Sequence, residues 1–208
     1  MIRKAHLLRR HSVTVTLAVL AGLTTLILAP ASRAQESNVQ IDAAQTKIEF
    51  SLAGNFHTVH GQFALKSSAI HLDPSTGKMD GAIVVDATSG ETGNRGRDAR
   101  MHREILESTK FPEIVFTPLR MMGKVAPEGA SRVEISGLFR LHGQDHEVTL
   151  PVDIKAASGK LQITTHIEIP YVQWGLKNPS NFFLRVSDRV AIEIQAAGHI
   201  QSGDASHQ

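Results

Sequence analysis

Side chains that could do acid–base chemistry are concentrated between Thr92 and Phe116, in a stretch that begins TGNRGRDARMHREILE. On a helix, Asp98 and His102 would lie one turn apart, so the carboxylate could orient the imidazole as a general base. The same residues also suit a helix that begins with an Asp cap and carries an exposed His, and we favour that structural interpretation. The stretch therefore predicts no catalytic residue.

A phosphate site is a second interpretation of this stretch. Gly93 and Gly96 alternate with Arg95 and Arg97, and backbone amides between glycines can hold an anion. The two glycines are not followed by a strand and a helix in the order of a phosphate loop, so a plain loop is the better interpretation.

Histidines are the candidate metal ligands, because the chain has no cysteine. His57 and His60 would face opposite sides of a strand, and His142 and His146 flank a turn, so neither pair is expected to converge with His102 on one ion. We predict no metal site. A nucleophilic enzyme is equally unsupported, since there is no Cys and no Gly-x-Ser-x-Gly elbow.

Aromatic residues gather in IPYVQWGLKNPSNFFLRVSD, Ile169 to Asp188, which holds the only Tyr, the only Trp and two of the eight Phe residues. Aromatic side chains in a connecting segment either close one end of a core or line the mouth of a ligand site. The sequence leaves both interpretations open.

The rest of the chain alternates apolar and polar residues, which is typical of strands with one buried face. Such runs begin at Ile48, Phe63, Ile70, Ile83, Ile114, Val133, Val148, Leu161 and Val190. They predict an all-β antiparallel sheet that closes into a barrel or stacks as a sandwich.

Helical periodicity is confined to the charged stretch. Met101, Ile105 and Leu106 would share an apolar face that must dock on the sheet. Arg100 with Glu104, and Arg103 with Glu107, are expected to form i,i+4 ion pairs, and Phe111-Pro112 is expected to end the helix.

Residues 1–34 have a basic start, an apolar middle and small residues at the end, which predicts a secretory signal peptide. A retained membrane anchor is the alternative. Five of the 22 basic residues and none of the 20 acidic ones lie in this segment, so residues 35–208 carry 17 basic against 20 acidic residues. We expect one domain, periplasmic or secreted, that has no basic surface for nucleic acid.

From about Val39 to Gly198 the chain resembles the exported YceI-like, polyisoprenoid-binding proteins. The similar pieces are IDAAQTKIEFS, VHGQF, TGNRGRD, KFPEIVF, LHGQDHEVTLPV and VSDRVAIEI. The resemblance implies an antiparallel lipocalin-like β-barrel with one short helix beside a mouth. It also implies a long-chain isoprenoid or similar lipid amphiphile, such as a quinone, as the ligand of an apolar cavity, with no metal, cofactor or catalytic residue.

The expected site residues follow from the alternation and the resemblance. Interior positions are Phe50, Phe63, Phe116, Ile135, Phe139, Ile163 and Ile167; mouth positions are Tyr171, Trp174, Phe182 and Phe183; and Asn94, Arg97, Asp98 and His102 are expected to tie the helix down. A register shifted by one residue would turn an interior side chain outward.

Two other functions stay open alongside an exported binding protein that sequesters or carries such an amphiphile. One is a stress-related structural or interaction barrel with a filled core. The other is an exported enzyme that uses Asp98 and His102. The sequence also leaves a homodimer open.

Overall fold

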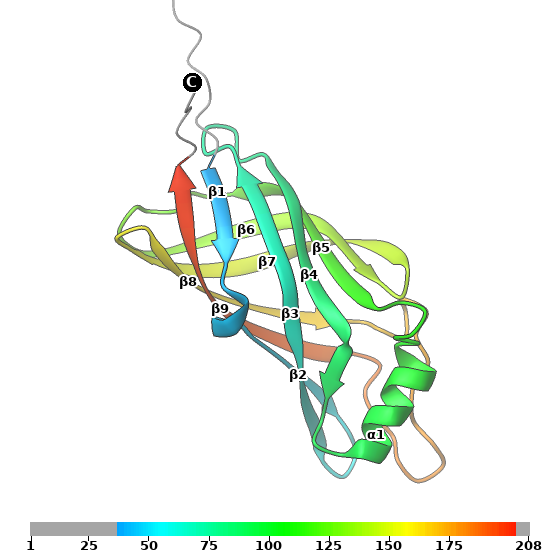
Figure 1. Ribbon diagram of the computed structural model, residues 1–208. Helices are drawn as coiled ribbons and strands as arrows, with labels where there is room; N and C mark the ends of the chain where they lie inside the picture. The colour runs from blue at the N-terminus through cyan, green and yellow to red at the C-terminus, as the bar shows by residue number, and fades with distance from the viewer. Residues whose placement is uncertain (1–36, 203–208) are drawn as a thin grey trace, which may run out of the picture. The chain divides into compact units, whose positions relative to one another are not determined.

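Nine antiparallel strands fill eight positions of a closed β-barrel in the computed structural model, which describes residues 37–202 (Figure 1). The predicted signal peptide lies outside these residues. From β2 onward each strand pairs with the next, and β2 pairs with β9 to close the ring. The ring comprises β2 (Lys47–Ala53), β3 (Thr58–Leu72), β4 (Met79–Glu91), β5 (Glu113–Met122), β6 (Gly129–Leu141), β7 (Gln144–Ala157), β8 (Lys160–Ile169) and β9 (Val190–Ser202).

The remaining strand, β1 (Ser37–Ile41), occupies the same position in the ring as β2. It pairs with the C-terminal parts of β3 and β9, whereas β2 pairs with their N-terminal parts. Asp42 separates the two strands, because its side chain accepts a hydrogen bond of 2.9 Å from the Ala44 amide and caps a short 3₁₀ turn, η1 (Ala43–Gln45). Together β1 and β2 complete the wall.

A β-bulge explains why β3 reads as two runs in the sequence. The two runs beginning at Phe63 and Ile70 belong to one strand of 15 residues. The pairing of β3 with β4 shifts register between Leu65 and Ser67. Both Lys66 and Ser67 are exposed, so the residues of β3 that point inward change from odd to even numbers. One extra residue therefore keeps both apolar sets inside the barrel.

One short helix lies beside one end of the barrel, between β4 and β5 (Figure 1). It consists of α1 (Arg95–Arg100) and one π-helical segment, η2 (Met101–Ile105). The predicted antiparallel, lipocalin-like barrel with one short helix beside a mouth is confirmed, and closure by β2 and β9 excludes the sandwich.

Three local expectations for the helix were wrong. Asn94, not Asp98, caps it, because the Asn94 side chain accepts from the Arg97 amide at 3.0 Å. The helix ends before Phe111-Pro112, since Glu107 has a positive φ of 45°. Arg103 pairs with Glu104 rather than Glu107, whose carboxylate lies 3.3 Å from His142 Nε2.

Close packing between strands allows only glycine at position 61. A Cβ there would overlap the ring of the paired Phe50 and would lie 2.5 Å from the carbonyl oxygen of Glu91. We predict that Gly61→Ala lowers the free energy of unfolding by about 1–3 kcal/mol, because a backbone oxygen cannot move aside as a side chain can. Urea denaturation measures the change.

Gly96→Ala is the matched control. A Cβ at Gly96, within α1, would meet only Asn94 Oδ1 at 3.6 Å. We expect this variant to be as stable as the parent or more so, by up to about 1 kcal/mol, because alanine favours a helix. Equal effects at the two positions would contradict the close packing.

Candidate ligand-binding tunnel

An apolar chamber of about 200 Å³ occupies the barrel interior, away from the helix. Side chains from all nine strands line it, together with Thr46 and Val125 from connections. Among the lining side chains of the described residues only Thr46 and Thr165 are polar. Thr165 Oγ1 donates to the Pro151 carbonyl at 2.8 Å, and Thr46 Oγ1 donates to the Asp42 carbonyl at 2.6 Å. We call this cavity the lower chamber. Because both hydroxyl protons are already donated to carbonyls of the wall, the lower chamber offers a ligand almost only apolar contacts.

A second chamber of about 200 Å³, which we call the upper chamber, lies between the barrel and the helix. Phe63, Ile114, Phe139 and Ile192 line both chambers, and we call these four residues the waist. The chambers therefore adjoin, with the waist between them, and we call the two together the tunnel. Their combined volume falls within the roughly 300–1,000 Å³ typical of ligand pockets.

Polar side chains line the tunnel mainly at its helix end, which we call the mouth. Those of the upper chamber are Thr92, Arg97, Arg100 and Tyr171. Arg97 is held in place, since its Nε donates to Thr92 Oγ1 at 2.7 Å and its Nη2 donates to the Thr92 carbonyl at 3.0 Å. The tunnel thus has an apolar interior and a mouth where a charged or polar group can lie.

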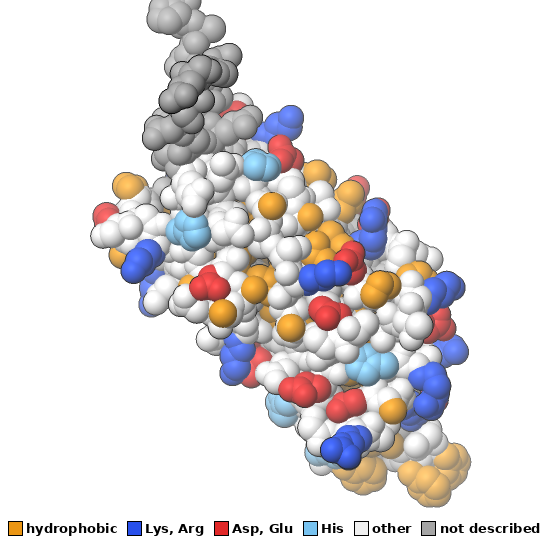
Figure 2. All heavy atoms as spheres, in the orientation of Figure 1, with side chains coloured by type: hydrophobic (Ala, Val, Ile, Leu, Met, Phe, Trp, Pro, Cys, Tyr) orange, Lys and Arg blue, Asp and Glu red, His pale blue; other side chains and the backbone are white. Residues whose placement is uncertain are grey.

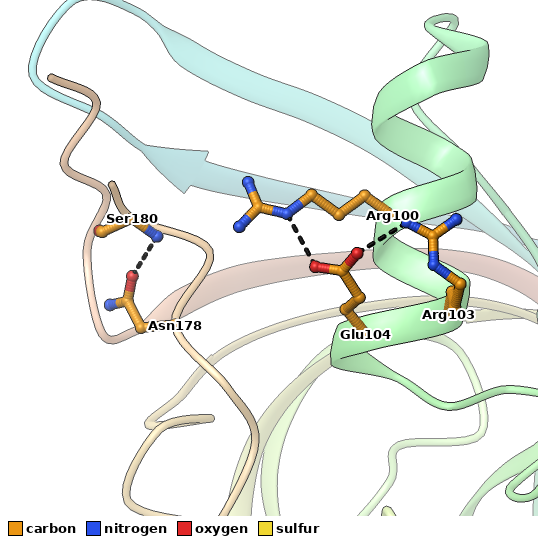
Figure 3. Close-up of polar contacts among 5 residues, drawn as sticks. All are labelled: Arg100, Arg103, Glu104, Asn178 and Ser180. Carbon is orange, nitrogen blue, oxygen red and sulfur yellow. Dashed lines mark hydrogen bonds and ion pairs between the residues drawn. The ribbon is translucent and has the colours of Figure 1, made fainter. Parts of the chain in front are cut away.

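Arg100 and Arg103 share one carboxylate at the mouth (Figure 3). Arg100 Nε donates to Glu104 Oε2 at 3.1 Å, and Arg103 Nη2 donates to Glu104 Oε1 at 2.7 Å. These hydrogen bonds from Arg103 and Arg100 lower the pKa of Glu104. Two cations against one anion leave the cluster positively charged, and Figure 3 shows the Arg100 side chain extending toward the loop of Asn178 and Ser180.

The helix is tied to β4 and to the residue that follows it by side chains that the sequence singled out. Asp98 accepts hydrogen bonds from the amide and hydroxyl of Thr92. His102 Nε2 lies 2.8 Å from the Gly90 carbonyl, and its Nδ1 lies 3.0 Å from Ser108 Oγ. Since a carbonyl can only accept, we assign the proton to Nε2, which leaves Nδ1 to accept from Ser108.

This arrangement engages both imidazole nitrogens of His102 and directs Asp98 to Thr92 instead of His102. Neither His102 nor Ser108 lines either chamber, and Ser108 is only 5% exposed, so this pair does not face the cavity. The geometry therefore favours a structural role for Asp98 and His102.

Tyr171 closes the upper chamber from the β8–β9 connection. Its side chain is 5% exposed and packs in a small cluster with Leu141, Ile169 and Leu176, against which Ile105 and Leu106 of the helix region also lie. Its hydroxyl donates to the Ser187 carbonyl at 2.7 Å. Burial, followed by the negative charge of Asp188, raises the pKa of Tyr171 to about 12.

The sequence matches the family described as YceI-like domain over residues 39–197. This chain belongs to the YceI-like family. The resemblance in the sequence is thereby confirmed. No curated protein matches the chain.

Solved structures share the YceI-like fold of this barrel at low identity. BcnA of Burkholderia cenocepacia superposes with a TM-score of 0.64 at 15% identity, covering 76% of this chain and 98% of that one. A polyisoprenoid binding domain from Saccharophagus degradans gives 0.58 at 14% identity, covering 78% and 98%. A YceI protein of Campylobacter jejuni gives 0.55 at 18% identity, covering 68% and 84%. At these identities the likeness establishes the fold alone.

The YceI-like barrel places the predicted interior residues along the tunnel. Phe50 lines the upper chamber; Phe63 and Phe139 belong to the waist; Phe116, Ile135, Ile163 and Ile167 line the lower chamber. Whether a ligand contacts them stays a prediction.

The predicted mouth residues divide into three groups. Tyr171 lines the upper chamber. Trp174 lies one layer behind the wall, stacked on His146 with ring centroids 4.1 Å apart and 5.8 Å from the ring of Phe139. Phe182 and Phe183 project into solvent instead of into the tunnel. The aromatic residues of segment 169–188 thus both close the barrel end and border the mouth.

The sequence did not predict several other residues that line the upper chamber of this YceI-like chain. The helix contributes Arg100, Met101, Ile105 and Leu106, and the β8–β9 connection contributes Leu176, Pro179, Leu184 and Val186. The apolar face of the helix was visible in the sequence, but its docking position was not. No periodicity marks the residues of the long connection.

Within residues 37–202, no group of three His, Cys, Asp or Glu side chains comes together so that it could hold a metal ion. None of the helices in this range is long and apolar enough to cross a membrane.

The single Tyr of the chain makes its burial measurable. We predict that the phenolate absorbance of the native protein titrates with a midpoint of about 12, against 10.0 for an unperturbed Tyr. The pKa of Tyr171 is higher in the folded protein than in the unfolded chain. The contribution of the protonated Tyr171 to the free energy of unfolding is therefore complete below pH 10 and is lost as the pH rises toward 12. A native midpoint equal to that of the protein unfolded in guanidinium would contradict the buried position.

Proposed function

We propose that this chain is an exported, periplasmic or secreted binding protein that sequesters or carries a polyisoprenoid, quinone or similar lipid amphiphile. The observation that supports this most directly is the polarity of the tunnel. Its lower chamber is apolar throughout except for two engaged threonines, and its mouth carries Arg97 and Arg100. The tail of an amphiphile would lie in the lower chamber and the waist, with its head group at the mouth.

Burial of a hydrocarbon tail supplies the affinity in this proposal. Each buried methylene contributes about 0.8 kcal/mol, so ten contribute about 8 kcal/mol before other costs are subtracted. Loss of translational and rotational freedom alone costs roughly 4–15 kcal/mol. Ten methylenes therefore barely offset association, and we expect ligands with longer chains that pass through the waist into the lower chamber.

Binding fits the geometry better than catalysis does. The side chains that could form an acid–base pair serve to hold the helix, because Asp98 bonds Thr92 and His102 bonds Gly90 of β4. A barrel with a filled core fits less well, because two adjoining chambers of about 200 Å³ each remain between the side chains. The family match, and the likeness to a polyisoprenoid binding domain of Saccharophagus degradans, agree with a lipid ligand.

Native mass spectrometry of the mature protein, expressed with export, tests the proposal. Organic extraction should then release a stoichiometric prenyl or acyl compound. A protein that is free of ligand, and that stays so after incubation with quinones, polyprenols and fatty amphiphiles, would contradict it and favour an interaction barrel.

A substitution in the lower chamber tests the direction of binding. Ala196 points into this chamber, while the adjacent Ala197 faces the other side of β9. We predict that Ala196→Leu weakens binding of long polyprenols at least tenfold and leaves short ones nearly unaffected, because the added carbons occupy the end of the tunnel. Ala197→Leu is the control.

Competition against a hydrophobic dye, followed through quenching of Trp174 fluorescence, gives the affinities. An equal loss for all chain lengths, or an equal effect of Ala197→Leu, would show that the tail does not reach the lower chamber.

A further inference from the structure

Three phenylalanines protrude at the mouth of the tunnel. Phe56, Phe182 and Phe183 are 75%, 89% and 78% exposed, far more than other large apolar residues of the described chain, such as Met122 at 46%. Phe56 lies in the β2–β3 connection and the other two lie in the β8–β9 connection. Figure 2 shows hydrophobic side chains projecting at this end of the barrel. We call these three side chains the aromatic tip.

The aromatic tip is held by a built structure. The backbone amide of Asn55 donates to the Arg185 carbonyl at 3.0 Å. The side-chain oxygen of Asn55 accepts from the backbone amide of Arg185 at 3.2 Å. Asn181 Oδ1 accepts from the amides of Phe183 and Leu184 at 3.0 and 2.7 Å. These bonds join the two connections and fix the turn from which Phe182 and Phe183 project, so their exposure is a feature of the fold.

The aromatic tip borders the entrance of the tunnel. Pro179, Leu184 and Val186, from the same connection as Phe182 and Phe183, line the upper chamber. Leu184 follows Phe183 directly, so adjacent residues face the solvent and the tunnel. A surface that covers the aromatic tip would therefore lie against the connection that lines the upper chamber.

Positive charge surrounds this end of the barrel. The helix and the two connections that hold the aromatic tip contain seven Lys and Arg residues against four Asp and Glu residues, counted over residues 54–57, 92–107 and 170–189. The rest of residues 37–202 contains ten against fourteen. Arg185 lies two residues after Phe183, and the side chain of Arg103 is 69% exposed. The charge at the mouth is therefore complementary to an anionic surface.

We propose that the mouth docks on an anionic lipid bilayer, with the aromatic tip in the interfacial region and the surrounding cations against the head groups. Aromatic side chains beside basic residues favour this region of a membrane. Docking would open the tunnel onto the hydrocarbon layer, so a lipid tail could enter without crossing water. A protein seated on the same surface would cover the entrance, which is why the position of the tunnel favours the bilayer. The ligand exchanged in this way rests on the proposed function, whereas the docking itself does not.

Co-sedimentation with vesicles of phosphatidylethanolamine and phosphatidylglycerol tests the docking. We expect the mature protein to bind these vesicles, to bind less at high salt, and to bind phosphatidylcholine vesicles weakly. Phe182→Ala combined with Phe183→Ala should reduce partitioning at least tenfold. Met122→Ala, which removes an exposed apolar side chain where β5 ends, away from the helix, should change it less than twofold.

Phe183→Trp in a Trp174→Phe background gives a single reporter at the aromatic tip. Its emission should shift to the blue on the anionic vesicles and be quenched by lipids brominated in the acyl chain. Unchanged emission, or equal losses for the tip variant and Met122→Ala, would overturn the proposal. A parent protein that is dimeric in sedimentation analysis and becomes monomeric in the tip variant would assign the surface to a second copy of this chain, and would also overturn it.

Binding of farnesol and geranylgeraniol in solution separates this proposal from the proposed function. The tip variant should retain the affinity of the parent for both alcohols but take them from vesicles at least tenfold more slowly. Loss of vesicle binding with intact alcohol binding is the expected result for that variant. Vesicle binding by a parent protein that binds neither alcohol would leave the docking standing and count against the lipid-carrier function.

Discussion

Closure of the sheet is the constraint on which the rest of the structure depends. An apolar cavity can exist only if the wall around it satisfies its own backbone amides and carbonyls, since no polar group inside can replace the lost water. Pairing of β2 with β9 achieves this, with β1 and the η1 turn completing the position beside them. The bulge in β3 keeps this wall continuous. Pairing with β4 continues on both sides of the bulge, while the apolar residues before and after it all point into the barrel.

The helix and the β8–β9 connection turn this closed wall into a tunnel with one polar end. Asp98 and His102 hold the helix against the C-terminal end of β4 and the adjoining Thr92. Met101 and Ile105 can therefore line the upper chamber while Arg97 and Arg100 remain at its edge. Residues that resemble a catalytic pair thus act as anchors. The polar groups that border the tunnel are consequences of how the helix is held, and they set the direction in which an amphiphile would enter.

Sequence patterns predicted the barrel well because alternation reports directly on which face is buried. The same reasoning placed Phe63, Phe116 and Phe139 inside. It failed where local chemistry competed with the pattern: Asn94 rather than Asp98 caps the helix, and Glu107 in a left-handed conformation ends it before Phe111-Pro112. It was silent on Leu184 and Val186, whose segment has no period from which a direction could be read.

By itself the sequence determined an antiparallel all-β fold, its inward-facing residues and the family, because strand alternation and short motifs are local properties of the chain. Tertiary structure alone decided that the sheet closes, that two chambers adjoin at the waist, and that Phe182 and Phe183 face solvent while Tyr171 is buried. These features depend on contacts between residues far apart in the sequence, such as Asn55 with Arg185, which no local pattern encodes.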